Sequence, residues 1–568
     1  MAYHRICWRV ALALLAFALA LLPSAGADVI ALPTKYLPAY FLRTQDLPAL
    51  LVILAALALV GWRAPALALP ERPVRLAAVA LVAALMALAL WLGTHALMLD
   101  YPLTRDEHMV VFDMAIFGRG QLAQPLAAEW RGYADALVPA FRLENPGNAF
   151  LVSAYLPGNA MMRTAFAMLA DPALMNPLLA AVGLLALFDV ARRLFPDDAR
   201  AVLVVLASYV LSAQMLVTAM TAYAMTAHLA LNLVWLALFV RGKWWQHALA
   251  MLVGIWAIGL HQLVFHPLFA GPVILTLLAQ RRWGLFAAYA GVYGAALLFW
   301  ISYPLLVAAG FGLAGEPGAP GGIAGFWSER VQPLLDAQSL FTFKVLLFNL
   351  VRFAAWTPLF VLPLVALSRE AVVANRGWAL PLFGGIAATL VAIAILLPYQ
   401  GHGWGYRYLH GLIGNFALLA GYGYVRWASH NRAQADGAIA VLAAVTALVV
   451  LPMQAYAAHS FTRPNAESQR SLAALPGDFV IIDSHPAIYA VDFARNRADL
   501  GNAPLLLWSG ALDRADVARL CERGTVTMVD SGTLQGLFFG QPGQGRTRHF
   551  AQLTAGLAGR DCLRPLQD

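Results

Sequence analysis

Long apolar runs separated by short polar turns dominate the chain up to residue 458. About thirteen of these runs are long enough to cross roughly 30 Å of hydrocarbon as α-helices. The expected spans cover 8–25, 47–63, 74–98, 173–193, 200–218, 222–240, 246–260, 263–280, 284–309, 340–367, 378–398, 410–427 and 437–458. The pattern predicts a polytopic α-helical membrane protein.

Two of these spans form one apolar run that is interrupted only by GLHQLVFHP. Gly259 and Pro267 favour a turn there, so two short helices at 246–260 and 263–280 fit better than one long helix. A single span would move every later loop to the other side of the membrane.

Basic residues are concentrated in every second turn between the spans. They are Arg63, Arg72, Arg75, Arg192, Arg193, Arg200, Arg241, Lys243, Arg281, Arg282, Arg369, Arg376, Arg426 and Arg432. By the positive-inside rule these turns face the cytoplasm, as does the N-terminus. The longer loops at 26–46, 99–172, 310–339 and 399–409, and the tail from about 459, then lie outside the cytoplasm.

The first apolar run resembles a secretory signal, with a basic start and SAGA after it. Because many spans follow, we favour an uncleaved first helix. We therefore expect an N-terminal transmembrane hairpin at 1–73 and a transmembrane catalytic domain at 74–458. Segments 117–126, 150–155 and 161–169 of the loop at 99–172 are expected to be interfacial helices.

After His459 the chain becomes polar and its pattern changes to short apolar runs alternating with helical stretches. The sequences DFVIID, APLLLW and TVTMVD predict buried strands, and PAIYAVDFAR and ALDRADVARLCERG predict helices. Residues 459–568 are therefore expected to form a small α/β domain of about 110 residues. No glycine-rich phosphate loop opens its helices, so no nucleotide is assigned.

Composition supports the membrane class: of 568 residues, 61% are hydrophobic and 12% are charged. This balance excludes a soluble globular protein. A net charge of +8 can indicate a nucleic-acid partner. Here the basic residues occupy short loops without interleaved aromatics, so we expect membrane lipid and no nucleic acid as partners.

Three cysteines, Cys7, Cys521 and Cys562, show no metal-ligand spacing. If the C-terminal domain lies on the oxidising side of a bacterial inner membrane, Cys521 and Cys562 can form a disulfide. Two buried free thiols are an equal alternative.

An acidic pair, Asp106 and Glu107, follows directly after the span at 74–98. Thr104 and Glu107 fit a helix capping box, so the pair could be structural. Alternatively, a partly dehydrated carboxylate here could take the proton of an acceptor hydroxyl while its neighbour orients substrate or binds a divalent cation.

The pair and its following FDMAIFGRGQLAQP resemble the first extracytoplasmic loop of the GT-C superfamily. The resemblance continues through YLPGNAMMRTAFAML, LLAAVGLLALFDVARRLFPDDAR and LPYQGHGWGYRYLHG, over roughly residues 74 to 427. These polytopic glycosyltransferases use polyprenyl-phosphate sugars and include the protein mannosyltransferases and the lipid A aminoarabinose transferases. The N-terminal hairpin and the C-terminal domain are not part of the resemblance.

The resemblance implies an inverting glycosyltransferase with Asp106 as the catalytic base and Glu107 beside it as a substrate-binding residue. The donor would be a polyprenyl-phosphate sugar, and the acceptor a glycan, lipid or protein. A transporter or flippase of lipid-linked saccharides is the alternative, although no internal repeat or pair of broken helices supports it.

A glycine-rich loop, PYQGHGWGYRYLHG, lies on the same expected side as Asp106. Its aromatic residues could simply belong to the membrane interface belt. A guanidinium near the membrane plane needs an anion, and a lipid-linked phosphate provides one. We therefore assign Arg407, His402 and Tyr399 to substrate binding.

His261 and His266 flank the expected turn of the short hairpin. Their spacing of five does not fit a helical metal pair, so no metal site is assigned. They either contact substrate or are hydrogen-bonded interior histidines. Other loop residues, which are either solvated or line an acceptor cleft, are Arg142, Glu144, Asn145, Asn148, Tyr155 and Asn159.

Overall fold

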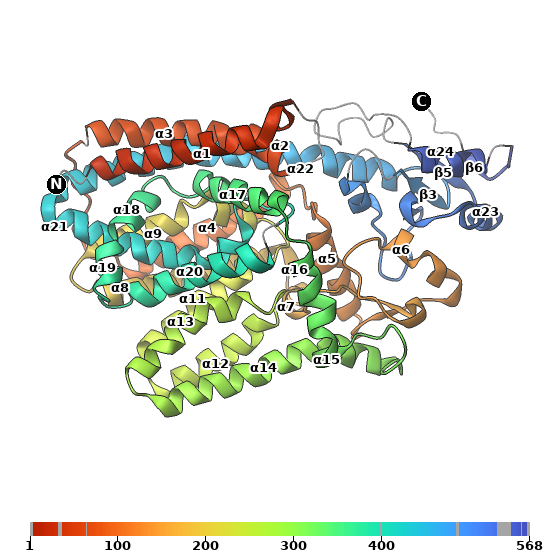
Figure 1. Ribbon diagram of the computed structural model, residues 1–568, viewed down its shortest axis with the longest axis horizontal. Helices are drawn as coiled ribbons and strands as arrows, with labels where there is room; N and C mark the ends of the chain where they lie inside the picture. Colours follow the sequence, from red (N-terminus) through yellow and green to blue (C-terminus); the bar gives the residue numbers. More distant parts are fainter. Residues whose placement is uncertain are drawn as a thin grey trace.

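A computed structural model describes residues 4–31, 37–63, 65–397, 400–483, 488–530, 547–557 and 559–564. The apolar runs are helical because a chain in hydrocarbon must satisfy its backbone N–H and C=O groups within each segment. A helical bundle forms one end of the elongated molecule and a small α/β domain the other. Helix α22 (Leu451–Ala473) runs between them (Figure 1).

Each expected span overlaps helical chain in the structure. The bundle contains α1 (Arg5–Ala31), α2 (Leu37–Phe41), α3 (Leu47–Trp62), α4 (Leu76–Ala96), α8 (Met175–Leu194), α9 (Ala199–Val210), α10 (Ala213–Ala219), α11 (Met225–Arg241), α12 (Trp244–Ile258), α13 (Phe265–Ala279), α14 (Trp283–Gly310), α17 (Leu340–Ala355), α18 (Val361–Leu367), α19 (Arg369–Val373), α20 (Ala379–Leu396) and α21 (Ile413–Val445). By length and hydropathy, 6 helical segments of the described chain can cross a membrane, or 7 if α9 and α10, bent by 50°, form one span. The molecule is a multi-pass membrane protein, and the number thirteen stays a prediction.

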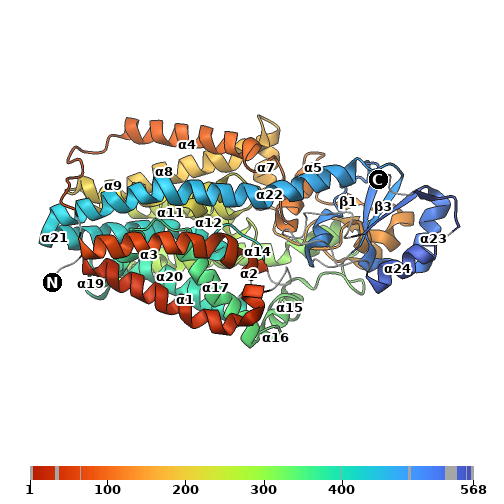
Figure 2. The ribbon, with the colours of Figure 1, turned by 90° about the horizontal axis from the view of Figure 1, so that it is seen from above.

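Helix α4 shows how the bundle meets lipid. Leu81, Leu85, Leu88 and Leu92 recur on one helical face and are 49% to 61% exposed. Met86 and other residues on the opposite face are buried in the bundle. Figure 2 shows α4 at the edge of the bundle. An exposed apolar stripe of this kind indicates a surface covered by lipid.

The apolar run between residues 246 and 280, which could form one helix or two, forms two helices, α12 and α13. Backbone contacts hold the turn between them: Gly158 N–H donates to the Gly259 carbonyl at 2.9 Å, and Asn159 N–H donates to that of Leu260 at 3.1 Å. The predicted hairpin is confirmed, and its turn lies against the beginning of α7 (Gly158–Ala167).

The loops with the expected cytoplasmic arginines meet at the end of the bundle away from the α/β domain (Figure 1). Ion pairs connect these loops to one another and to nearby helices. They are Arg200–Glu71 (2.6 Å), Arg241–Asp189 (2.9 Å), Arg426–Glu370 (2.6 Å) and Arg432–Asp198 (3.7 Å). The alternation read from the sequence therefore corresponds to one end of the folded molecule.

The first long loop folds into α5 (Arg105–Phe117), a β1–β2 pair (Gln124–Pro125 and Phe150–Leu151), α6 (Ala134–Leu137) and α7. The predicted interfacial helices at 117–126 and 150–155 are wrong, because α5 ends before Gly118 and Phe150–Leu151 is a strand. Short apolar runs do not distinguish helix from strand. The helix expected at 161–169 overlaps α7. The loop at 310–339 carries α15 (Gly322–Phe326) and α16 (Gln332–Asp336).

The α/β domain contains a parallel sheet in the order β4-β3-β5-β6. Its elements are β3 (Phe479–Ile482), β4 (Leu505–Trp508), α23 (Arg514–Arg523), β5 (Val526–Val529), α24 (Arg548–Ala555) and β6 (Leu563–Arg564). The three expected strands are confirmed, as is the helix capped by Asp513. The helix expected from PAIYAVDFAR is only a short 3-10 turn, Ile488–Phe493. Cys521 and Cys562 form a disulfide.

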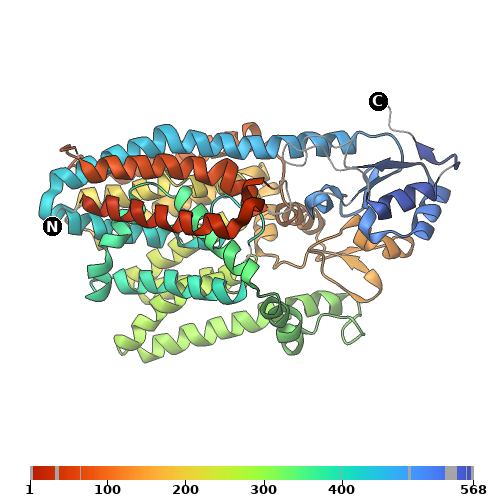
Figure 3. The same ribbon diagram turned by 45° about the horizontal axis from the view of Figure 1, so that its top comes forward.

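The first loop and the α/β domain share one apolar core. Met109 and Phe112 of α5 and Leu137 of α6 belong to the same buried cluster as Ile481 of β3 and Leu507 of β4. Figure 3 shows the loop elements, in brown and orange, packed beside the blue domain. The two segments are far apart in sequence but form one layer over the end of the bundle.

Candidate functional site

Asp106 lies in the first turn of α5, where a capping box fixes the backbone. The Glu107 N–H donates to the Thr104 hydroxyl oxygen, and the Thr104 N–H donates to the Glu107 carboxylate, both at 3.4 Å. Asp106 is only 6% exposed. The predicted cap is confirmed, and it sets the direction in which the Asp106 side chain leaves the helix.

Arg407 forms a buried ion pair with Asp106, although the two residues are 301 positions apart. One guanidinium nitrogen of Arg407 donates to Oδ2 of Asp106, and the Tyr155 hydroxyl donates to Oδ1. The structure thus joins the acidic pair of the first loop to the glycine-rich loop that ends the span at 378–398.

The charge on Asp106 is stabilised by these neighbours. Burial raises the pKa of Asp106, but the positive charge of Arg407 and the hydrogen bonds from Tyr155 and Arg407 bring it below its usual value. His261 stacks on Tyr155 with 4.1 Å between ring centroids. Burial lowers the pKa of His261 to about 4. At neutral pH the site therefore holds an ionised Asp106 beside a neutral imidazole.

Tyr223 and His402 extend the site. The Tyr223 hydroxyl lies 2.9 Å from the Thr104 hydroxyl and 3.1 Å from Nδ1 of His402. The Arg407 guanidinium lies over the Tyr223 ring, 5.8 Å from its centroid. His402 stacks on Phe461, and burial lowers its pKa well below the usual range. These contacts place His402 beside Arg407 as a neutral group.

The loop that carries Arg407 is held by Arg352 of α17. The Arg352 guanidinium donates to the carbonyls of Gly403 at 2.7 Å and Gly405 at 3.1 Å, and it pairs with Asp46 at 3.2 Å. Gly405 has a φ of +70°, and a Cβ there would meet the Gln214 side chain at 2.3 Å. The N-terminal hairpin, which supplies Asp46, thus supports the Arg407 side of the site.

Glu107 uses both carboxylate oxygens to bind backbone. One accepts the Thr104 N–H and the other the Ala222 N–H, at 3.1 Å. Burial raises the pKa of Glu107 to about 7. Glu107 therefore connects α5 to the turn between α10 and α11, while Asp106 contacts Arg407.

Of the remaining predicted site residues, some line a pocket beside Arg407 and others do not. His261 and Arg407 line one small pocket together with His228 and Phe265. His266 lies deeper and bonds to the Asn232 side chain at 2.8 Å, as expected of an interior histidine. Tyr399 lies outside the described residues.

The described residues do not form a cluster of side chains that could coordinate a metal ion. No group of three or more His, Cys, Asp or Glu side chains within the ranges given above lies close enough to hold one. The oxygens of Asp106 and Glu107 are already engaged by Arg407, Tyr155 and backbone amides. The site therefore does not fit a divalent cation without rearrangement, and no chemical step is assigned to one.

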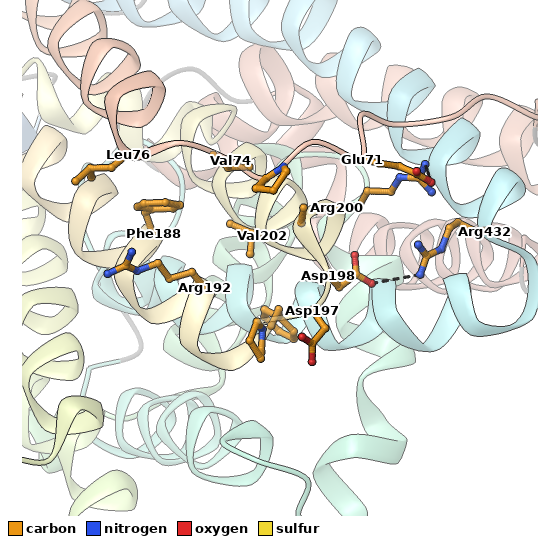
Figure 4. Close-up of a pocket in the computed structure, with 14 residues that line it drawn as sticks. Glu71, Val74, Leu76, Phe188, Arg192, Asp197, Asp198, Arg200, Val202 and Arg432 are labelled. Carbon is orange, nitrogen blue, oxygen red and sulfur yellow. Dashed lines mark hydrogen bonds and ion pairs between the residues drawn. The ribbon is translucent and has the colours of Figure 1, made fainter.

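A larger cavity of about 450 Å³ lies at the opposite end of the bundle (Figure 4). Most of its charged lining residues form ion pairs: Arg200 pairs with Glu71 and Asp436, Arg192 with Asp189, and Arg432 with Asp198. These pairs connect loops and helices at the bundle end that carries the arginine-rich loops.

Several residues of the site were not identified from the sequence. Arg352 is a charge inside the apolar run at 340–367, which is a signal of a buried partner, whereas Asp46 lies at the end of the loop before the span at 47–63. In the sequence, Tyr155 is only one of several polar residues of the first long loop. Tyr223, in contrast, stands in a context without such a signal.

Comparisons with known proteins identify the fold. No protein-family model matches the chain, and no curated protein sequence does so either. Among solved structures, ArnT from Cupriavidus metallidurans bound to undecaprenyl phosphate is similar at a TM-score of 0.51 and 14% identity, over 84% of this chain and 87% of that chain. Its apo form is similar at a TM-score of 0.48, with the same identity and coverage. The first of these likenesses shows that the chain shares the fold of ArnT.

Proposed function

We propose that the chain is an inverting glycosyltransferase that moves a sugar from a polyprenyl-phosphate donor to an acceptor outside the cytoplasm. The observation that carries this proposal is the buried pair of Asp106 and Arg407. Burying two charges is costly, so such pairs concentrate at functional sites. The lipid bound to the fold neighbour, undecaprenyl phosphate, supports a donor of this class.

Arg407 is suited to bind the donor phosphate. A phosphate competes with the Asp106 carboxylate for the same guanidinium, because both are anions that accept its hydrogen bonds. When Arg407 turns to the phosphate, Asp106 loses its strongest opposing charge and its pKa rises. Donor binding therefore makes Asp106 a stronger base at the moment when a base is needed.

The transfer is a single displacement. Asp106 takes the proton of the acceptor hydroxyl, and the acceptor oxygen attacks the anomeric carbon of the sugar. The bond from that carbon to the phosphate oxygen breaks, and its electron pair stays on the phosphate. Arg407 stabilises the charge that develops there. Attack from the face opposite the phosphate inverts the configuration.

We place the site on the periplasmic side of a bacterial inner membrane, with the N-terminus in the cytoplasm. The arginine-bearing loops at the other end of the bundle support this orientation through the positive-inside rule. The disulfide between Cys521 and Cys562 supports it too, because disulfides persist in oxidising compartments. The acceptor would be a glycolipid, a polysaccharide or a protein.

The test is sugar transfer from a polyprenyl-phosphate sugar by purified protein in liposomes. Asp106→Asn should lower turnover by about 10²–10⁴-fold, because it removes the general base. Glu129→Gln, an exposed acid on the same loop, is the matched control and should retain activity. Transfer by Asp106→Asn at the parent rate would refute the mechanism. Movement of lipid-linked sugar between leaflets without any transfer would favour a flippase.

A further inference from the structure

A short segment of the α/β domain binds the backbone that leads into α5. Arg495 donates to the Pro102 carbonyl at 2.5 Å and to the Leu103 carbonyl at 2.9 Å. Its guanidinium also lies over the Tyr101 ring, 4.4 Å from the centroid. The two carbonyls directly precede Thr104, which caps α5. One side chain of the domain therefore fixes where this helix begins.

The same segment contacts the first residue of α5 from the other side. The Asp492 carboxylate lies near the Arg105 backbone N–H, which favours its charged form. This amide belongs to the first turn, where N–H groups lack partners within the helix and favour a negative charge. In return, the Arg105 side chain donates to the Ala494 carbonyl at 2.8 Å. Contacts thus run in both directions between the domain and the residue next to Asp106.

The rest of the interface is buried as well. Arg105 is 2% exposed, and α5 packs its apolar face into the core that it shares with the sheet. Asn496 bonds to the Leu137 carbonyl at 3.0 Å and to that of Leu506 at 2.8 Å, which ties α6 to β4. The domain is therefore built onto the loop that carries Asp106.

We propose that the α/β domain positions Asp106, with Arg495 and Asp492 as positioning residues that do not touch substrate. This inference rests on the proposed function. Asp106 is the second residue of α5, so a one-residue shift of the helix start would turn its side chain by about 100°. Such a shift would separate Asp106 from Tyr155 and Arg407. The domain thus acts as a scaffold for the base, while the donor phosphate is bound from the bundle.

The experiment compares Arg495→Ala and Arg495→Lys with Arg497→Ala in the full-length protein. Arg497 is a matched control, since its side chain is 62% exposed and pairs with Asp499 of its own domain. Two quantities are measured: hydrogen exchange of the backbone amides from 104 to 108, and kcat and KM for a polyprenyl-phosphate sugar. Melting temperature reports whether each variant folds.

Arg495→Ala should speed exchange of these amides and lower kcat by about 10–100-fold, since small displacements of a catalytic group cost this much. The KM for donor should change by less than about twofold, because Arg407 is held elsewhere. A lysine at position 495 can donate to fewer carbonyls, so the amide exchange rates and the kcat of Arg495→Lys should lie between those of the parent and Arg495→Ala. Arg497→Ala should match the parent.

Parent-like exchange and kcat in Arg495→Ala would overturn the inference. If Arg495→Ala does not fold, Arg495→Lys decides, and values equal to the parent in that variant would also overturn it. A parent protein that transfers no sugar would refute the proposed function instead. Hydrogen exchange at the start of α5 would then still test the positioning role.

Discussion

The two charged residues of the site are supported by different parts of the molecule. Asp106 is held from the α/β domain, through contacts of Arg495 and Asp492 with the backbone at the start of α5. Arg407 is held from the helical bundle, through Arg352 and its buried partner Asp46. The site therefore lies between two separately packed cores, and each core contacts the segment that carries one of the two charges.

This division gives structural roles to the two terminal regions of the chain. The N-terminal hairpin supplies Asp46, and the C-terminal domain supplies Asp492 and Arg495. Polar contacts to backbone carbonyls position a segment firmly because each one is lost if the segment shifts. The two supports should be separable: one should affect the base and the other the binding of donor.

Breaking the bundle support should have the largest effect on stability. Arg352→Ala leaves Asp46 buried without its cation, which typically costs about 3–5 kcal/mol. Binding of the polyprenyl-phosphate sugar should weaken in parallel, because the Gly403 and Gly405 carbonyls lose the hydrogen bonds that Arg352 donates. Thermal unfolding in detergent and donor titration measure both, with the exposed Arg376→Ala as control. A melting temperature and donor affinity equal to those of the parent would contradict the assigned role.

Removing the disulfide should have a smaller effect that is confined to the α/β domain. Cys521→Ser with Cys562→Ser frees a link across 41 positions, and loss of such a link typically costs about 2–4 kcal/mol. Limited proteolysis should cut the domain faster while donor affinity stays at the parent value. Weakened donor binding would show that the two supports are not separate.

The smallest effect is expected in the pH dependence of stability. Asp113 of α5 accepts hydrogen bonds from the Ser153 backbone N–H at 3.0 Å and from the Ser153 hydroxyl, and burial raises its pKa to about 7. A raised pKa means that the folded state binds the proton more tightly than the unfolded state. The resulting stability is fully present below about pH 4 and is lost as the pH rises through 7.

Asp113→Asn tests this sign, because an asparagine can keep both bonds to Ser153. The melting temperature of the parent should fall more steeply between pH 5 and pH 8 than that of Asp113→Asn. Glu107, with a pKa of about 7, and Asp492, with a pKa of about 6, titrate in both proteins and cancel in the comparison. Parallel curves would mean that Asp113 does not titrate in this range.

The sequence predicts the helices well because hydrophobic length is a direct physical requirement of the membrane. It also predicts the hairpin of α12 and α13, the capping box of Thr104 and Glu107, and the strands of the α/β domain, since each depends on local pattern. The helices expected at 117–126 and 150–155 failed because short apolar runs are ambiguous and pairing of β1 with β2 decides their structure.

The long-range contacts of the site could not be derived from local pattern. The basic character of Arg407 predicted a lipid-linked phosphate as its anion, whereas the structure pairs its guanidinium with Asp106. In contrast, Arg495 lies in a polar domain where arginines are common, and its contact with Pro102 and Leu103 depends on how two distant segments pack. Tyr223 likewise bonds to Thr104 and His402 only because the turn before α11 reaches α5.

The most direct test of the division of labour is donor binding and single-turnover transfer, measured together for Asp106→Asn and Arg407→Ala. We predict that Asp106→Asn binds a polyprenyl-phosphate sugar at least as tightly as the parent, because it frees Arg407, yet transfers almost none of it. Arg407→Ala should lose most donor affinity. Transfer at the parent rate by Asp106→Asn, or equal loss of donor affinity in both variants, would contradict the account.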